Sequence, residues 1–325
     1  MRKILEDYLN WSSQLKRALT AEVLNPASLD VGSLSGIAFV GMGGSGIIGD
    51  IVAKYLEREV ATPVVVVKSF ALPKYVDSKW LVVAVSYSGN TLETLTVFSE
   101  AARRRVKLAA VSSGGRLMEL AEKLGVSRIY VESGYLPRVA LPSMLAKTVV
   151  LLNKLTNLKI DIERGVEILK DVEGPEAARE LANFLSGGLP VFVVTENMYP
   201  LGIRAKNEMN ENAKIACKVE VLPEWGHNDV VGWESTPRDL VKIVVLRDGF
   251  TELADFAAEY LRKLNYSLKV LEVGRVGYFE TVLYGSWVIG LASVLLASIR
   301  GVNSESTESI EHYKQFIHSY LKFYI

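Results

Sequence analysis

The sequence predicts an α/β protein of two doubly wound subdomains, each with a mainly parallel sheet sandwiched between helices. Short runs of Val, Ile, Leu and Ala alternate with segments of helical apolar spacing, and this alternation occurs twice along the chain. Runs that are so continuously apolar are typical of parallel strands covered on both faces. The predicted strands are residues 37–41, 63–68, 80–86, 106–112 and 127–132, followed by 189–196, 217–224, 241–248 and 267–274.

Helical segments lie between these strands, as right-handed crossovers require. They cover residues 46–58, 91–105, 202–216 and 250–265. Further helical material, within 142–156 and 174–185, separates the two sets of strands. We therefore expect one subdomain over residues 1–155. We expect a second over residues 156–325, with a helical connection at about 156–186 and a C-terminal helix.

Composition limits the classes of partner. The 325 residues are 49% hydrophobic, which is enough for a sizeable core. Formal net charge is zero, which argues against a nucleic acid or an anionic membrane as the main partner. Cys217 is the only cysteine, so no intrachain disulfide can form. Together with an N-terminus that lacks the apolar core of a secretory signal, this favours a cytoplasmic location.

One segment is long enough to cross a membrane. Residues 281–299 carry no charge over 19 positions. The segment is the only one of its kind in the sequence and is rich in Gly, Ser and Ala. We therefore expect a helix buried in the core or at a dimer interface, and no membrane partner.

A glycine-rich turn follows the first predicted strand in "GIAFVGMGGSGIIGD", residues 36–50. Gly41, Gly43 and Gly46 fit the G-x-G-x-x-G pattern of dinucleotide-binding loops, but any tight strand-to-helix turn favours glycine. A dinucleotide site also needs an acidic residue at the end of the second strand. That strand ends in Lys68 and Ser69, although a cofactor with a 2′-phosphate could tolerate Lys68.

A second turn, in "SYSGNTLET" (residues 86–94), follows the third predicted strand and is rich in hydroxyl groups. Two such turns at one sheet edge would bring several hydroxyls and helix N-termini around one small volume, which favours an anion. We therefore predict a monophosphate pocket and no nucleotide cofactor. The alternative is that the hydroxyls only cap helices. The predicted pocket residues are Gly43, Gly44, Ser45, Ser86, Ser88 and Thr91.

Both turns resemble those of the sugar isomerase (SIS) domain superfamily. Four later motifs make the chain similar, over nearly its whole length, to the archaeal bifunctional phosphoglucose/phosphomannose isomerases. The resemblance implies two SIS subdomains, a homodimer with sites shared between subunits, and interconversion of glucose, fructose and mannose 6-phosphates without a cofactor. The four motifs are "YLPRVAL" (135–141), "NENAK" (210–214), "WGHNDVVGW" (225–233) and "ESIEHYK" (308–314).

Aldose–ketose isomerisation moves a proton between C2 and C1 of the sugar through a cis-enediolate, so it needs a base that reaches both carbons. Glu211 is predicted late in a helix, where the negative end of the helix dipole raises the basicity of a carboxylate. Arg204, Glu208 and Glu211 share one helical face, and their spacing alone favours a surface ion-pair face. The resemblance assigns the base to Glu211 and not to Glu208.

Opening of the sugar ring needs an acid, and a cation should stabilise the enediolate. His227 lies in a predicted loop beside Gly226 and Asn228, and imidazole exchanges protons near neutral pH, although a lone loop histidine is often only solvated. The resemblance implies that His227 opens the ring from the neighbouring subunit, with Lys314 beside it. A solvated lysine is the alternative for Lys314.

Arg138 follows Pro137 near the end of a predicted strand, and its guanidinium can hold the enediolate without titrating. The alternative for Arg138 is an ordinary exposed arginine. The resemblance also implies that Thr307 accepts the mannose epimer.

The residues also bear on two alternative functions and on a metal site. A non-catalytic SIS protein that senses a sugar phosphate would keep both hydroxyl-rich turns but would need neither Glu211 nor His227. An aminotransferring hexosamine-phosphate synthase would need an N-terminal glutaminase domain, for which a chain beginning Met1-Arg2 has no room. The three histidines, at positions 227, 312 and 318, are too scattered to form a ligand cluster, so we predict no metal.

Overall fold

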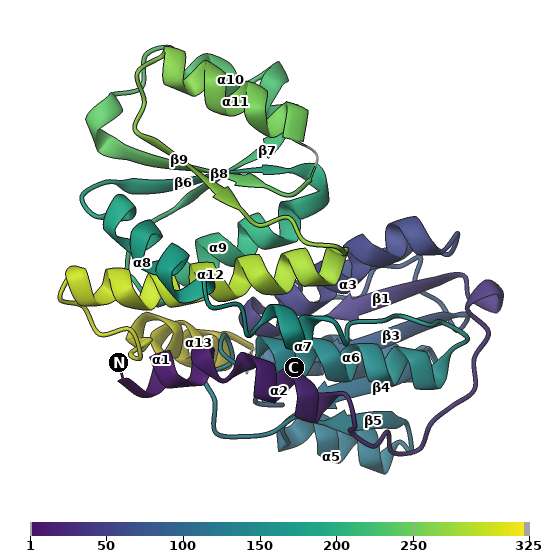
Figure 1. The fold of residues 1–325 in the computed structure, drawn as a ribbon. Helices are drawn as coiled ribbons and strands as arrows, with labels where there is room; N and C mark the ends of the chain where they lie inside the picture. The colour runs from purple at the N-terminus through teal and green to yellow at the C-terminus, as the bar shows by residue number, and fades with distance from the viewer. Residues whose placement is uncertain (1, 250, 322–325) are drawn as a thin grey trace.

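The computed structural model describes residues 2–249 and 251–321, and this part of the chain contains two parallel sheets with helices between and around them (Figure 1). The N-terminal sheet has the strand order β2-β1-β3-β4-β5. Every neighbouring pair in it is parallel. Its strands are β1 (Gly36–Val40), β2 (Val64–Val67), β3 (Trp80–Val85), β4 (Lys107–Ser112) and β5 (Ser127–Tyr130).

The C-terminal sheet is also parallel throughout and has the order β7-β6-β8-β9. It lies above the first sheet in Figure 1. Each strand predicted from the sequence is present, with ends that differ by at most two residues. The strands are β6 (Leu189–Thr195), β7 (Lys218–Leu222), β8 (Val241–Arg247) and β9 (Leu268–Glu272).

Helices cover both faces of the N-terminal sheet, as its continuous apolar strands predict. The helices α3 (Gly43–Glu59) and α6 (Leu141–Leu155) contact one face, and α4 (Leu92–Arg103) and α5 (Gly115–Lys123) contact the other. Alternate residues of β1 follow this division. Phe39 packs in the cluster that contains α3 and α6, and Ala38 packs in the cluster that contains α4 and α5.

The C-terminal sheet is covered in the same way. On one face α9 (Tyr199–Glu211) contacts β6 and β7, and on the other α11 (Thr251–Lys263) contacts β6, β8 and β9. The remaining helices are α1 (Arg2–Leu9), α2 (Trp11–Ala18), α7 (Gly165–Ile168), α8 (Gly174–Leu185), α10 (Asp229–Gly232), α12 (Tyr278–Ile299) and α13 (Glu308–Leu321), and the 3₁₀ turns are η1 (Val31–Ser33), η2 (Glu196–Met198), η3 (Glu224–His227) and η4 (Arg238–Leu240).

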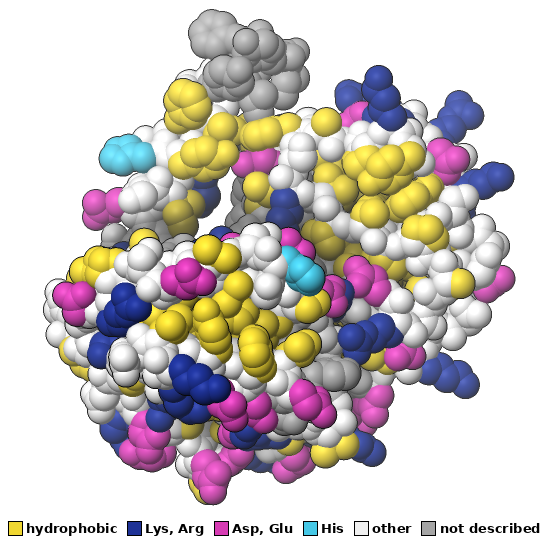
Figure 2. Space-filling view, turned by 90° about the horizontal axis from the view of Figure 1, so that it is seen from above, with side chains coloured by type: hydrophobic (Ala, Val, Ile, Leu, Met, Phe, Trp, Pro, Cys, Tyr) yellow, Lys and Arg dark blue, Asp and Glu magenta, His cyan; other side chains and the backbone are white. Residues whose placement is uncertain are grey.

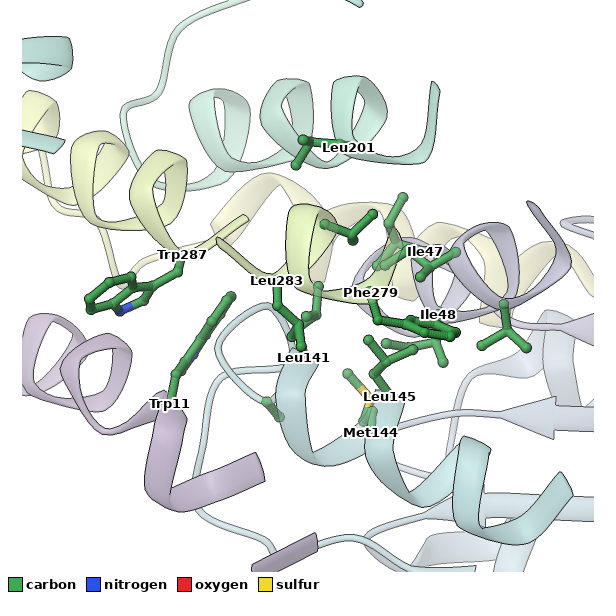
Figure 3. Packing of buried hydrophobic residues seen from close by; sticks show 14 of the residues in the cluster. Trp11, Ile47, Ile48, Leu141, Met144, Leu145, Leu201, Phe279, Leu283 and Trp287 are labelled. Carbon is green, nitrogen blue, oxygen red and sulfur yellow. The ribbon is translucent and has the colours of Figure 1, made fainter. Parts of the chain in front are cut away.

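Helix α12 lies between the two sheets and packs on α1, α7, α8 and α9. By length and composition it could cross a membrane, but 83% of its most apolar window is buried inside the protein. The prediction of a buried core helix is therefore confirmed. Figure 3 shows Phe279 and Leu283 of α12 beside Leu141 of α6, and Trp287 facing Trp11 of α2. This single helix joins the cores of the two sheets.

The contact between α8 and α12 leaves no room for a side chain at Gly174. A Cβ atom there would lie 2.2 Å from Cζ3 of Trp287. We expect Gly174→Ala to lower the free energy of unfolding by about 1–3 kcal/mol, because overpacking displaces the indole ring. Gly232→Ala is the matched control, since nothing lies within 4 Å of its added Cβ. Equal unfolding free energies of the two variants in urea would contradict this packing.

Candidate active site

The site lies at the carboxyl ends of β1 and β3. In the order β2-β1-β3, the helix after β1 (α3) covers one face of the sheet and the helix after β3 (α4) covers the other, and ligands bind at such a switch point in open α/β sheets. One turn leads from β1 into α3, and the other, residues 86–91, leads from β3 into α4. A Cβ on Gly44 would lie 3.2 Å from the carbonyl carbon of Pro137, so the first turn touches the loop that carries Arg138.

A hydrogen bond ties the two turns together, and another lies within the turn of residues 86–91. The backbone N–H of Tyr87 donates to Oγ of Ser45 at 2.9 Å, and Ser86 Oγ donates to Thr91 Oγ1 at 3.2 Å. Ser45 and Ser86 are buried, whereas the side chain of Ser88 is exposed. Thr91 occupies the N-cap position of α4 but makes no side-chain cap hydrogen bond. The hydroxyl of Thr91 therefore accepts a hydrogen bond from Ser86 and does not cap the helix.

Tyr87 braces the second turn, and sequence reasoning did not single it out. Its phenol hydroxyl donates to the carbonyl oxygen of Glu132 and accepts from the N–H of Tyr135, each at 2.9 Å. Tyr87 therefore fastens the second turn to the segment that leads to Arg138. A large aromatic side chain between two predicted phosphate-binding serines was the available signal.

Arg138 lies in the turn before α6, a few residues beyond the end of β5, and is only 2% exposed. The alternative of an exposed arginine is therefore wrong. Its Nε donates to Oδ1 of Asn212 at 2.6 Å, and its Nη2 donates to the carbonyl oxygen of Ser304 at 2.6 Å. Its Nη1 donates to Oε2 of Glu211 at 3.2 Å. Three fixed bonds leave the guanidinium little freedom to turn.

Glu211, predicted late in a helix over residues 202–216, is the last residue of α9, which ends five residues before the predicted end, and its side chain is 23% exposed. It lines a pocket of about 430 Å³ together with Lys214 and Thr307. Lys214 donates from Nζ to the carbonyl oxygens of Glu211 and Ser306, the latter at 2.6 Å. Burial lowers the pKa of Lys214 below its usual value. The lysine thereby holds the segment before Thr307 against the end of α9.

Arg204 and Glu208 form an ion pair, as their spacing predicts, but the prediction that this pair lies on an exposed helical face is wrong. Both side chains are completely buried. Burial raises the pKa of Glu208 above its usual range, against the opposing effects of Arg204 and of the hydrogen bond from Tyr8. The spacing i,i+4 is the same on an exposed and on a buried helical face, so the sequence could not distinguish them.

His227 and Lys314 lie away from these groups within one chain. His227 is exposed at the end of η3, next to the edge strand β7. Lys314 is 58% exposed on α13 and pairs with Glu311 at 2.8 Å. Among the described residues, no hydrogen bond or ion pair joins either side chain to Arg138 or Glu211. Within one chain Glu211 pairs with Arg138 and lines a pocket with Thr307, whereas neither His227 nor Lys314 is bonded to these groups among the described residues.

No group of three or more His, Cys, Asp or Glu side chains within the described ranges could hold a metal ion. The first turn touches the loop that carries Arg138, and Arg138 pairs with Glu211, so a carboxylate and a fixed cation lie side by side next to this turn.

Known proteins with similar sequences cover most of this chain. A bifunctional phosphoglucose/phosphomannose isomerase of Aquifex aeolicus is 33% identical over 88% of this chain and 91% of its own length. One of Pyrobaculum aerophilum is 32% identical over 97% and 99%. The chain belongs to the bifunctional phosphoglucose/phosphomannose isomerase family. The family model described as "Bacterial phospho-glucose isomerase C-terminal SIS domain" matches residues 175–317.

One further protein similar to this chain is named for a different activity. A D-glucosamine-6-phosphate 4-epimerase of Sulfolobus acidocaldarius is 33% identical over 88% of this chain and 90% of its own length. Among solved structures, the C-terminal domain of a glucosamine-fructose-6-phosphate aminotransferase of Francisella tularensis aligns with a TM-score of 0.69 at 16% identity, over 93% of this chain and 98% of that one. This likeness shows the SIS-type fold.

Proposed function

We propose that this member of the phosphoglucose/phosphomannose isomerase family interconverts glucose 6-phosphate and mannose 6-phosphate with fructose 6-phosphate. The observation that supports this most is the ion pair between Arg138 and Glu211 at the pocket. It supplies a base and a fixed cation at one place, which is what a reaction through an enediolate requires.

In the proposed reaction, Glu211 removes the proton from C2 of the aldose and returns it to C1 of the enediolate, while the hydroxyl proton passes from O2 to O1. When the carboxylate takes the proton, it loses its charge and the sugar gains one. Arg138 then faces an enediolate oxygen in place of a carboxylate. The net charge of the buried cluster stays constant through the step, so the site needs no large reorganisation.

The two hydroxyl-rich turns fit the phosphate group. They open helices α3 and α4, whose first N–H groups and dipoles favour an anion. Ser88 has an exposed hydroxyl, and Ser45 braces the two turns. We assign these turns to the subdomain of residues 1–155 and the base to that of residues 156–325. The sugar would then lie between the two subdomains, with Thr307 at the far side of the pocket.

We assign the ring-opening acid to His227 of a second copy of the chain, with Lys314 beside it in the completed site. Apolar side chains near His227 are exposed on α10 and α11, among them Val231 and Phe256. Figure 2 shows hydrophobic side chains gathered on this face. On α13, Ile310 and Tyr313 are also exposed next to Lys314. Surfaces of this kind support a homodimer in which each site is completed by its partner.

The base is tested with Glu211→Gln, which keeps the shape of the side chain. We expect kcat to fall by roughly 10²–10⁴-fold with a smaller change in KM, because an amide cannot accept the proton. The variant should also fail to exchange the C1 proton of 5-deoxyfructose 6-phosphate, which cannot close its ring, with deuterium from solvent. His227→Ala should still perform this exchange. Glu308→Gln is the matched control, since Glu308 lines the same pocket. Exchange by Glu211→Gln at the wild-type rate would remove Glu211 as the base.

The phosphate pocket is tested with Ser88→Ala. Loss of a hydrogen bond to a charged group should weaken binding by about 1–3 kcal/mol, measured as a higher KM for fructose 6-phosphate or a higher Kd for inorganic phosphate in calorimetry. Ser33→Ala, at an exposed serine of η1, should leave both unchanged. NAD and NADP should show no saturable binding. Unchanged constants for Ser88→Ala would place the phosphate elsewhere.

The shared site is tested by mixing two inactive variants, Glu211→Gln and His227→Ala, after co-expression. If His227 acts in the partner's site, each mixed dimer has one site with both residues intact. Random pairing should then restore about a quarter of the wild-type activity, because half of the dimers are mixed and half of their sites are complete. If both residues act within one chain, every site keeps one defect and activity stays at the level of the separate variants.

The reaction itself is tested by coupled assays that start from fructose 6-phosphate and detect glucose 6-phosphate and mannose 6-phosphate separately. Formation of both products supports the proposal. Epimerisation of glucosamine 6-phosphate at C4 in place of isomerisation would favour the activity named for the relative from Sulfolobus acidocaldarius. Binding without turnover of any of these sugars would favour the sensing alternative.

A further inference from the structure

A buried polar cluster lies directly behind Arg138, on the side away from the pocket. It consists of Tyr8 from α1, Glu208 and Asn212 from α9 and its end, and Ser293 from α12. All four side chains are buried. Three segments far apart in the sequence thus bring polar groups to one point between the two sheets, where each unpaired group would carry a large cost.

Asn212 connects this cluster to the guanidinium. Its Oδ1 accepts from Nε of Arg138 at 2.6 Å, and its Nδ2 donates to Oε2 of Glu208 at 2.6 Å. An arginine Nε can only donate and an ionised carboxylate can only accept, so the amide has a single workable orientation. The carboxylate of Glu208 therefore fixes the direction of Asn212, and Asn212 fixes the direction of Arg138.

Tyr8 fixes Glu208 in turn. Its hydroxyl donates to Oε2 of Glu208 at 2.5 Å and accepts from Nδ2 of Asn212 at 3.2 Å. The Tyr8 ring sits directly against α12, where a Cβ on Gly290 would lie 2.3 Å from Cε1 of the ring. On the other side of Glu208, Arg204 pairs with its carboxylate and donates to the backbone carbonyl of Arg138. The cluster thus holds both the side chain and the backbone of Arg138.

We propose that Tyr8, Glu208 and Asn212 are positioning residues for the isomerisation, which hold the Arg138 guanidinium where the negative charge of the enediolate develops. The inference rests on the proposed function. It also gives the N-terminal helix α1 a part in the chemistry, although Tyr8 does not reach the pocket. The competing explanation is that the cluster only satisfies buried polar groups and stabilises the fold.

The two explanations differ in what they do to a ground-state ligand and to an enediolate mimic. Loss of positioning should weaken an interaction that is strongest when charge develops, and should spare binding of the phosphate and sugar chain. Loss of fold stability should lower melting temperature without separating the two ligands. The probes are arabinonate 5-phosphate, whose carboxylate mimics the enediolate oxygens, and sorbitol 6-phosphate, which has no such charge.

We expect Asn212→Ala to lower kcat by about 10–100-fold and to weaken the binding of arabinonate 5-phosphate by a similar factor. The Kd of sorbitol 6-phosphate should change by less than about twofold. Tyr8→Phe should act in the same direction by about 3–10-fold, because only its hydroxyl is removed. Asn153→Ala and Tyr278→Phe are matched controls. The Asn153 amide bonds to the backbone of Ile160, and the Tyr278 hydroxyl to the backbone of Ile51. Both controls should alter melting temperature only.

Two results would each overturn the positioning role and leave the proposed function intact. The first is that Asn212→Ala weakens the binding of both ligands equally, and the second is that Tyr8→Phe leaves kcat unchanged. The Tyr8 variant decides the question if the Asn212 variant does not fold. If the wild-type protein neither turns over the sugars nor prefers arabinonate 5-phosphate to sorbitol 6-phosphate, the proposed function fails and the positioning role fails with it.

Discussion

Two guanidinium groups are buried between the sheets, and the need to neutralise them organises the centre of the molecule. Arg138 and Arg204 are each at most 2% exposed. An isolated charge at such depth costs several kcal/mol, so each needs a carboxylate and further hydrogen bonds. Arg204 pairs with Glu208, which is equally buried, while Arg138 pairs with Glu211, which is not. The cluster reaches the solvent at Glu211, which lines the pocket.

This arrangement requires the two sheets to be held at a fixed separation. Helix α9 supplies Arg204, Glu208 and Glu211 from the C-terminal half, and the loop before α6 supplies Arg138 from the N-terminal half. The apolar helix α12 fills the space between the halves, packing on α8 and α9 of the C-terminal half and on α1 of the N-terminal half. Since hydrogen bonds to a charged group weaken with distance, a looser core would weaken the pairing of Glu211 with Arg138.

The sequence predicts the strands of both sheets well, but it does not predict the buried polar contacts of Tyr8 and Arg204 between the sheets. Strands such as β1 and β3 are buried on both faces, so every position is apolar and their boundaries are clear in the sequence. The motif around Glu211 and the turn around Ser88 are local, and both are found where they were expected along the fold. Tyr8 is different, because its partner Glu208 is 200 residues away and nothing in the helical pattern of α1 indicates a polar contact. Helix α12 packs on α9, which carries Arg204, and the helical periodicity within α9 does not indicate that this contact exists.

The separation of His227 from Glu211 within one chain is consistent with the chemistry proposed for them. A neutral imidazole placed beside a free carboxylate would tend to take a proton and pair with it, which would occupy both the acid and the base. Here Glu211 already has Arg138 as its partner, and His227 lies at the outer end of β7. If a second chain brings the imidazole to the sugar ring, the two groups meet only across the bound substrate. In that case assembly of the dimer, rather than folding of the chain, would complete the site.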